Sequence, residues 1–347
     1  MEKQQLKDLT LEEMQKWVES LGEKKFRAQQ IFRRIYEGAI SFEEMTELPK
    51  ELRSRLDGCA EIGSVRQIRR QISEKDGTRK YLFQVRGGAA VESVFMKYRY
   101  GNTACLSSQA GCRMGCAFCA SGADGLQRNL TAGEIVDQMI SMSRDAQERI
   151  GHIVVMGTGE PFDNYDELIR AIRILHDQNG PDISLRNITV STCGLLPKIL
   201  SFARDMPQVS LAVSLHAADD EKRRILMPVA SSYSMAELLS VCRQYTEMTR
   251  RRITFEYALI DGVNDAEEDA RKLSVRLKGM LCHVNLIPLN RVRESGFAGT
   301  ARKKAEKFAE ILQKHRIPVT IRRELGSDIS AACGQLRLQE KEESKDR

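Results

Sequence analysis

The chain has 347 residues, of which 41% are apolar, enough for one large domain or for one domain with a small appendage. With 54 Lys and Arg against 48 Asp and Glu, the net charge is +6, a mild excess that suits nucleic-acid binding without identifying it. No stretch is long and uncharged enough to span a membrane, and the first residues, MEKQQLKDLTLEEM, contain no apolar run of the signal-peptide type. We therefore expect a cytoplasmic protein without membrane contact.

Short helices are predicted for the first sixty residues. Thr10 and Glu13 have the spacing of a capping box, in which each side chain accepts a hydrogen bond from the other residue's backbone amide. Ser41 and Glu44 repeat that spacing before another short predicted helix, and apolar residues recur at helical intervals between the two boxes. We therefore expect residues 1–60 to form a small helical accessory domain.

An antiparallel β extension is predicted over residues 61–102. Runs of strand-forming residues at 65–72, 81–85 and 91–96 are separated by an Asp-Gly and a Gly-Gly turn. The same segment concentrates basic residues with few acids, so it is either a phosphate-contacting patch or an ordinary solvated sheet face. The basic residues are Arg66, Arg69, Arg70, Arg79, Lys80, Arg86, Lys97 and Arg99.

From about residue 103 strands alternate with helices, one of which begins at a capping box of Thr131 and Glu134. Six strand–helix units predict a parallel sheet, either doubly wound or a partial barrel, with active residues at the carboxyl ends of the strands. We assign this core to residues 103–330 and expect residues 331–347 to form a loop and a disordered, charged tail. The predicted strands are 103–107, 153–156, 188–191, 211–214, 253–259 and 284–288.

Nine cysteines are an odd number, which argues against a fully paired disulfide framework. A cytosolic chain would keep most of them reduced. Four have apolar sequence neighbours and are predicted to be small core residues. They are Cys59, Cys193, Cys242 and Cys282.

Three further cysteines, Cys112, Cys116 and Cys119, stand at CxxxCxxC spacing in GCRMGCAFCASG. Three thiolates on one tight loop suit a cubane cluster, in which each cysteine binds one iron and the fourth iron is left open to a substrate. A ferredoxin-like electron carrier supplies four cysteines instead, and a structural zinc site needs four ligands. Zinc stays open as an alternative, with a distant fourth ligand such as His152 or Cys105.

This spacing, with the aromatic Phe118 before the last cysteine, on the loop after the first strand of α/β repeats, resembles the radical S-adenosylmethionine (SAM) superfamily. The resemblance implies a partial (β/α)6 TIM-like barrel and a [4Fe-4S] cluster on the three cysteines. It also implies that SAM chelates the open iron. One electron from the cluster would then split SAM into methionine and a 5′-deoxyadenosyl radical.

Motifs at the ends of later strands fit a SAM pocket. MGTGEPF, STCG, SLHA and IPLN each place polar residues or glycines at a predicted strand end, where they converge. The carboxylate of the first motif can accept hydrogen bonds from the methionine ammonium, and its glycines permit close backbone approach. The expected SAM-binding residues are Gly159, Glu160, Ser191, Ser214, Leu215, His216 and Asn290.

A longer series of motifs is similar to the bacterial RlmN family. VESVFMKY, CLSSQAGCRMGCAFCASG, NLTAGEIVDQM, MGTGEPFDN, STCG, SLHA, HVNLIPLN and TIRRELGSDISAACGQL follow one another as in that family, over nearly the whole chain. The resemblance implies a dual-specificity methyltransferase that acts on carbon 2 of adenine, in the peptidyl-transferase loop of 23S rRNA and just after certain tRNA anticodons. We expect a monomer that receives electrons from a donor such as flavodoxin or ferredoxin.

The family resemblance also assigns three catalytic residues. Cys333 would take a methyl group from one SAM, and the radical from a second SAM would convert it into a carbon radical that adds to the electron-poor adenine. Glu92 would remove the proton at carbon 2, and Cys105 would attack the sulfur of Cys333, releasing methylated RNA and leaving a disulfide. The helical domain and the basic stretch are the expected RNA-binding surfaces, because the adenine must be presented unstacked.

Two rival functions stay open from the sequence. A related methyltransferase modifies carbon 8 of the same rRNA adenine and has the same five cysteines. Pro161, after the Gly-Glu motif, favours the carbon-2 family. The rival from a different class is a non-catalytic RNA-binding protein that contains a structural zinc ion.

Overall fold

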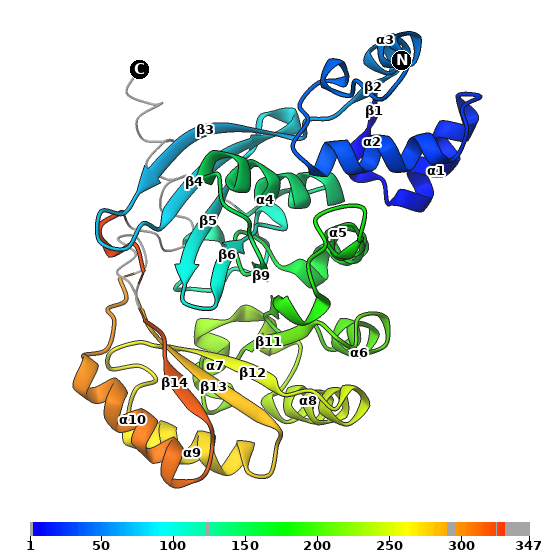
Figure 1. The fold of residues 1–347 in the computed structure, drawn as a ribbon. Helices are drawn as coiled ribbons and strands as arrows, with labels where there is room; N and C mark the ends of the chain where they lie inside the picture. The colour runs from blue at the N-terminus through cyan, green and yellow to red at the C-terminus, as the bar shows by residue number, and fades with distance from the viewer. Residues whose placement is uncertain (1–2, 123–124, 290–295, 324, 330–347) are drawn as a thin grey trace.

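The computed structural model describes residues 3–122, 125–289, 296–323 and 325–329. Its main feature is a ten-stranded sheet in the order β14-β13-β12-β11-β10-β9-β6-β5-β4-β3. Figure 1 shows this sheet with helices α4, α5, α6 and α8 stacked along one side of it. Within the described part of the chain, no helix has the length and apolar character needed to cross a membrane.

The parallel part of the sheet is the α/β core that the sequence predicts. Six strands each lead into at least one helix, as expected for the partial barrel, and the short strand β14, which the sequence analysis missed, adds to β13 in parallel. The strands are β6 (Gly101–Cys105), β9 (His152–Val155), β10 (Ile188–Thr192), β11 (Ser210–Ser214), β12 (Ile253–Leu259), β13 (Cys282–Pro288) and β14 (Val319–Ile321). The helices are α4 (Ala132–Ala146), α5 (Tyr165–His176), α6 (Leu196–Asp205), α7 (Asp220–Leu226), α8 (Met235–Thr249), α9 (Glu267–Leu277) and α10 (Arg302–Lys314).

Residues 3–60 are mainly helical, as predicted. The capping box of Thr10 and Glu13 is present at the start of the first helix. Ser41, by contrast, precedes only a 3-10 turn, Phe42–Glu44, so the helix expected there is wrong. A proline disfavours the α-helical conformation for the residue directly before it. The next helix accordingly starts only after Pro49. The helices are α1 (Leu11–Ser20), α2 (Phe26–Tyr36) and α3 (Lys50–Cys59).

The helical domain is attached to the core through the first described residues. The 3-10 turn η1 (Leu6–Asp8) packs against α4. Lys7 forms a buried ion pair with Asp137, and Asp8 accepts a hydrogen bond from the amide of Gly133 at 2.9 Å. One continuous apolar core runs through both parts. The strands that flank the helical domain and pair in parallel are β1 (Gln4–Gln5) and β2 (Ala60–Glu61).

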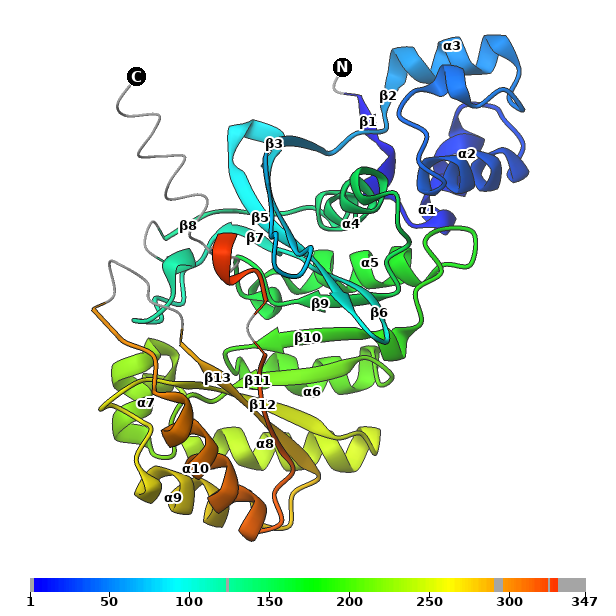
Figure 2. The same cartoon turned by 60° about the vertical axis from the view of Figure 1, so that its left-hand side comes forward.

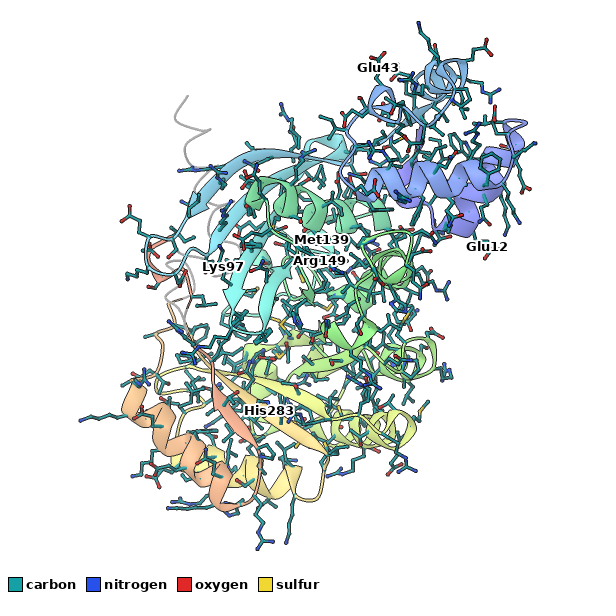
Figure 3. All side chains as sticks on the ribbon, viewed as in Figure 1. Glu12, Glu43, Lys97, Met139, Arg149 and His283 are labelled. Atoms are coloured by element: carbon teal, nitrogen blue, oxygen red, sulfur yellow. The ribbon has the colours of Figure 1, made fainter. Side chains whose placement is uncertain are left out.

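The antiparallel extension is confirmed, and most of its basic residues are engaged within the chain. Figure 3 shows Lys97, which pairs with Glu148. Because most of these cations already have a carboxylate partner within the chain, the structure favours a solvated sheet face over a phosphate-contacting patch. The ion pairs are Arg70–Asp145, Arg79–Asp145, Lys80–Glu92, Arg86–Asp8 and Lys97–Glu148. The strands are β3 (Val65–Ile72), β4 (Arg79–Val85) and β5 (Ala90–Tyr98), and β5 pairs antiparallel with β6.

The loop after β6 contains a hairpin that the sequence analysis missed. Strands β7 (Gln109–Gly111) and β8 (Leu126–Asn129) pair antiparallel, with a bulge between Ala110 and Gly111. The cysteine motif lies between these two strands, and Figure 2 shows β7 beside β5. The hairpin therefore fixes both ends of the cysteine loop.

The end of the described chain crosses from β14 to the opposite edge of the sheet. The amide of Gly326 donates to Asp76 at 2.9 Å. Asp328 accepts from the Ser73 hydroxyl at 2.6 Å and from the Glu74 amide at 2.9 Å. Figure 1 shows this segment beside the β3–β4 turn. The two edges of the open sheet are thus linked by the chain that leads toward Cys333.

Candidate active site

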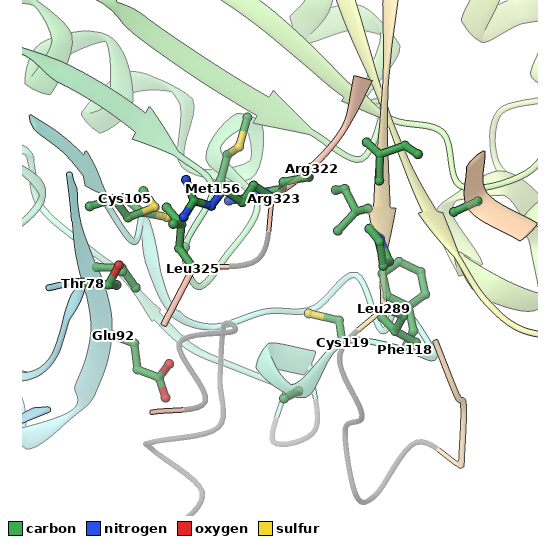
Figure 4. Close-up of a pocket in the computed structure, with 18 of the residues that line it drawn as sticks. Thr78, Glu92, Cys105, Phe118, Cys119, Met156, Leu289, Arg322, Arg323 and Leu325 are labelled. Atoms are coloured by element: carbon green, nitrogen blue, oxygen red, sulfur yellow. The ribbon is translucent and has the colours of Figure 1, made fainter. Parts of the chain in front are cut away.

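A cavity of about 920 Å³ is lined by the antiparallel extension, the cysteine loop and the ends of β13 and β14. Three residues predicted from the sequence line it: Glu92, Cys105 and Cys119. Figure 4 shows these side chains around the cavity, to whose lining Arg322 and Arg323 also contribute. The volume lies within the range of small-molecule sites.

Strand register explains why a carboxylate and a thiol share one wall of the cavity. Lys80 on β4 and Cys105 on β6 both lie opposite Val94 of β5. Residues directly opposite one another point to the same face of a sheet, and so does Glu92, two positions from Val94. The side chains of Lys80, Glu92 and Cys105 therefore project to the same side.

Lys80 and Glu92 form a buried ion pair. The Lys80 Nζ lies 3.0 Å from Oε2 of Glu92, and the two side chains are only 0% and 2% exposed. A buried carboxylate is stabilised as an anion when a cation and hydrogen bonds surround it. Lys80 thus holds in place the carboxylate assigned as the base. This partner was not predicted from the sequence, where its one signal was a lysine directly before the mostly apolar segment YLFQV of the same strand.

The Cys105 thiol is protonated at neutral pH. Burial raises the pKa of Cys105 to about 11, although the nearby Arg322 guanidinium opposes part of that rise. A thiol attacks as its thiolate, so Cys105 must lose a proton before it can act as a nucleophile. The positive charge of Arg322 favours that loss.

Backbone hydrogen bonds hold the cysteine loop in a tight turn. The amide of Cys112 donates to the carbonyl of Gly125 at 2.9 Å, and that of Cys119 donates to the carbonyl of Cys116 at 3.0 Å. Gly111 has φ 80°, and a Cβ there would lie 2.0 Å from the Gly125 oxygen. Only glycine fits this position, so Gly111 lets the chain enter the cysteine loop closely beside Gly125.

The three thiols fit an iron–sulfur cluster. Burial raises the pKa of Cys112 to about 11 and that of Cys116 to about 12, and Cys119 and Cys112 contribute to the rise at Cys116. The thiols are therefore neighbours, and they become thiolates when iron supplies the compensating positive charge. Within the described residues, no group of three or more His, Cys, Asp or Glu side chains is gathered as ligands of one metal ion. In a cubane each cysteine binds a separate iron, so the three thiols need not converge on one ion.

Glu160 joins the end of β9 to the end of β10. Its buried carboxylate accepts hydrogen bonds from the amides of Phe162 at 3.0 Å and Cys193 at 2.7 Å, and burial raises the pKa of Glu160. Gly159 has φ 105°, and a Cβ there would lie 2.5 Å from the Cβ of Gln109. Packing on Gln109 explains this glycine, whereas the contact of Glu160 with SAM stays a prediction.

The remaining described residues of the expected SAM site lie at strand ends, as predicted. His216 has φ 53°, its Nδ1 accepts a hydrogen bond from the Ala258 amide at 2.9 Å, and its ring centroid lies 4.8 Å from that of Phe118. Burial lowers the pKa of His216 to about 3, so the ring is neutral. The SLHA motif is thereby packed against the cysteine loop. The residues at these strand ends are Ser191, Ser214, Leu215 and His216.

Two predicted residues, Asn290 and Cys333, lie outside the described residues. Of the four cysteines expected in the core, three are buried, and Cys59 is partly exposed. Arg322 and Arg323 line the cavity but were not predicted as site residues from the sequence. Their signal was the paired arginine in TIRRELG, whose position at the end of the last strand could not be inferred because that strand was not predicted.

Comparison with known proteins gives the same assignment from several sides. The radical SAM superfamily model matches residues 106–273, and the ribosomal RNA large subunit methyltransferase N-terminal domain model matches residues 4–62. The "Probable dual-specificity RNA methyltransferase RlmN" of Alkaliphilus oremlandii is 51% identical, covering 97% of this chain and 98% of its own. The protein of that name from Thermoanaerobacter pseudethanolicus is 50% identical, covering 96% and 97%.

The solved structures agree with the sequence comparison. The crystal structure of a radical SAM methyltransferase from Sphaerobacter thermophilus superposes with a TM-score of 0.92 at 44% identity, covering 96% of this chain and 98% of that one. The expected radical SAM fold is therefore confirmed. The chain belongs to the RlmN family of radical SAM RNA methyltransferases.

Proposed function

We propose that this chain methylates carbon 2 of adenine in 23S rRNA and in tRNA. One observation carries the proposal: a single cavity contains Glu92, Cys105 and Cys119, in a chain related over nearly its full length to dual-specificity RNA methyltransferases. Membership of the superfamily implies a [4Fe-4S] cluster and SAM as cofactors. The carbon-8 alternative is not favoured, because the relatives from Alkaliphilus oremlandii and Thermoanaerobacter pseudethanolicus both carry the RlmN name.

Cys112, Cys116 and Cys119 would hold the cluster. When bound, the cluster supplies the electron that cleaves SAM. SAM would lie against the strand ends that carry Glu160 and His216, with the other residues predicted for its pocket. His216 is suited to a fixed wall, because its ring is neutral and its Nδ1 is already bonded to the Ala258 amide.

The cavity wall formed by the antiparallel strands would supply the base for the proton at carbon 2 and the cysteine that releases the product. Glu92, held by Lys80, would accept the proton from carbon 2 of the adenine. Cys333 would carry the methyl group and the RNA adduct. Cys105 would attack the sulfur of Cys333 as a thiolate, so that a sulfur–sulfur bond forms as the carbon–sulfur bond breaks, and the released carbon would keep the electron pair and take up a proton to become the methyl group. The position of Arg322 near Cys105 supports this role, since its charge stabilises the thiolate.

The parts of the chain divide these tasks. We propose that residues 1–60 are an RNA-binding accessory domain, 61–102 an extension that carries the base, 103–330 the SAM-binding core and 331–347 the catalytic loop and tail. The ion-paired basic stretch offers little free charge, so the arginines on the cavity wall are the better candidates for phosphate contacts. An electron donor such as flavodoxin or ferredoxin would serve a monomer working in the cytoplasm.

The deciding experiment incubates the anaerobically purified protein with SAM, dithionite and either unmodified 23S rRNA or tRNA. Mass spectrometry of the digested RNA should find 2-methyladenosine in both. Cys116→Ala, which lacks one cluster ligand, should give neither a brown protein nor product. Formation of 8-methyladenosine would assign the chain to the rival chemistry, and a colourless, zinc-containing protein without turnover would refute both.

A further inference from the structure

A buried arginine lies behind the cysteine loop. Arg223, on α7, has no exposed surface. Its guanidinium donates to the carbonyl of Cys193 at 2.9 Å and, at 3.4 Å, to that of Tyr233, while its Nε has no hydrogen-bond partner. Both acceptors are neutral carbonyls. The side chain is therefore a cation that its hydrogen bonds leave uncompensated.

The neighbours of Arg223 compensate its charge only from a distance. Its electrostatic partners are led by Cys193, Asp220 and Cys116, but no ion pair joins Arg223 to a carboxylate in the described part of the chain. Burial raises the pKa of Cys193 well above its usual value, so that thiol is neutral. The Asp220 carboxylate acts on Arg223 electrostatically, but its short hydrogen bond, at 2.6 Å, is accepted from the Met235 amide rather than from the guanidinium. The guanidinium is therefore a buried cation without a direct ion-pair partner among the described residues, and arginine does not lose its proton.

The structure ties Arg223 to the cysteine loop. The amide of Ala117 in that loop donates to the carbonyl of Leu226, at the end of the same helix, at 3.0 Å. The thiol of Cys116 interacts electrostatically with the guanidinium. Gly194 has φ 104°, and a Cβ there would lie 3.4 Å from Nη2 of Arg223, so this glycine leaves the space that the guanidinium fills.

We propose that Arg223 is the counter-charge of the cluster held by Cys112, Cys116 and Cys119, and that it raises the reduction potential of that cluster. Three thiolates outweigh the positive charge of an oxidised four-iron core, so the loaded site is an anion. One electron from an external reductant makes it more negative still. A fixed buried cation stabilises the reduced form more than the oxidised form, and net charge is among the factors that set such potentials. The inference rests on the proposed assignment of the cluster to these cysteines.

The test measures the potential of the reconstituted protein without SAM or RNA, so that it does not depend on turnover. The fraction of reduced cluster is followed by electron paramagnetic resonance while dithionite is titrated anaerobically in the presence of mediators. Arg223→Met should have a lower midpoint potential than the wild type, and Arg223→Lys, which keeps the charge, should recover most of the difference. Arg224→Met is the matched control, because it makes the same change at an exposed neighbour and should leave the potential unchanged.

Equal midpoint potentials for the wild type and Arg223→Met would overturn the inference, as would an equal shift in Arg224→Met. If Arg223→Met does not fold, Arg223→Gln takes its place, because its amide can still donate to the Cys193 carbonyl. A shift in Arg223→Lys as large as in Arg223→Gln would then show that charge is not the cause. A wild-type protein that binds no cluster would instead refute the assignment of the three cysteines.

Discussion

At the scale of single residues, the pKa of the Cys105 thiol is expected to set the rate at which the protein–RNA adduct decays. Because burial raises the pKa of Cys105 to about 11, only a small fraction is thiolate at neutral pH, and each unit of pH below 11 changes that fraction about tenfold. We predict that the covalent protein–RNA adduct decays faster as pH rises from about 6.5 to 9. Rapid quenching and denaturing gels measure the decay.

Arg322 provides the check on this pH dependence. Arg322→Gln should move the profile of adduct decay to higher pH, because it removes the charge that favours the thiolate of Cys105. A decay rate that is flat over this range in the wild type would contradict the prediction. It would mean that another step limits release.

The buried Lys80–Glu92 pair is predicted to be a large local contribution to stability. Lys80→Met leaves the carboxylate buried without its cation, which costs about 3–5 kcal/mol of unfolding free energy. Lys97→Met is the control, since its pair with Glu148 is 43% and 33% exposed and contributes less than about 1 kcal/mol. Urea unfolding measures both. Similar losses in the two variants would show that burial does not distinguish the pairs.

At the scale of elements, Gly133 near the start of α4 allows the helical domain to dock on the core. A Cβ at Gly133 would lie 2.5 Å from Oδ1 of Asp8 and 2.8 Å from the backbone of Lys7, so Gly133→Ala must displace the turn Leu6–Asp8. We predict faster limited proteolysis before α1 and weaker RNA binding, with uncoupled SAM cleavage retained.

Gly58 supplies the matched control for the docking prediction. It is also a helical glycine, but a Cβ there would meet nothing within 4 Å. Gly58→Ala should therefore stabilise α3 by about 0.5–1 kcal/mol and leave proteolysis and RNA affinity unchanged. RNA affinity that is unaffected in Gly133→Ala would refute the RNA-binding role of the docked domain.

The elements that could be predicted are those whose signal is local. The capping box of Thr131 and Glu134 and the alternating apolar strands are encoded within a few residues, and the structure has them close to their predicted bounds. Strands β7 and β14 have three residues each and exist because of their partners, so no periodicity could show them. Motifs indicated Glu92 and Cys105, whereas Lys80 and Arg223 gain their roles from strand register and burial.

At the scale of the whole molecule, the ten-stranded sheet is open, and the segment after β14 joins its two edges. Asp328 and Asp76 hold that segment against the β3–β4 turn. Cys333 follows a few residues later in the sequence, so we expect this contact to limit where the methyl-carrying cysteine can go. The contact between the segment after β14 and the β3–β4 turn would then couple the SAM-binding core to the wall that carries Glu92 and Cys105.

We predict that Asp328→Ala uncouples the two halves of the reaction. The variant loses the bonds from the Ser73 hydroxyl and the Glu74 amide, so the C-terminal segment should leave the turn while the cysteine loop is unchanged. Anaerobic assays should show SAM cleavage near the wild-type rate and RNA methylation reduced at least tenfold, a loss of about 1.4 kcal/mol in transition-state stabilisation. Glu74→Ala, which removes an exposed side chain and keeps the amide, is the control and should methylate normally. Equal loss of cleavage and methylation in Asp328→Ala would show that the segment supports the core rather than positioning Cys333.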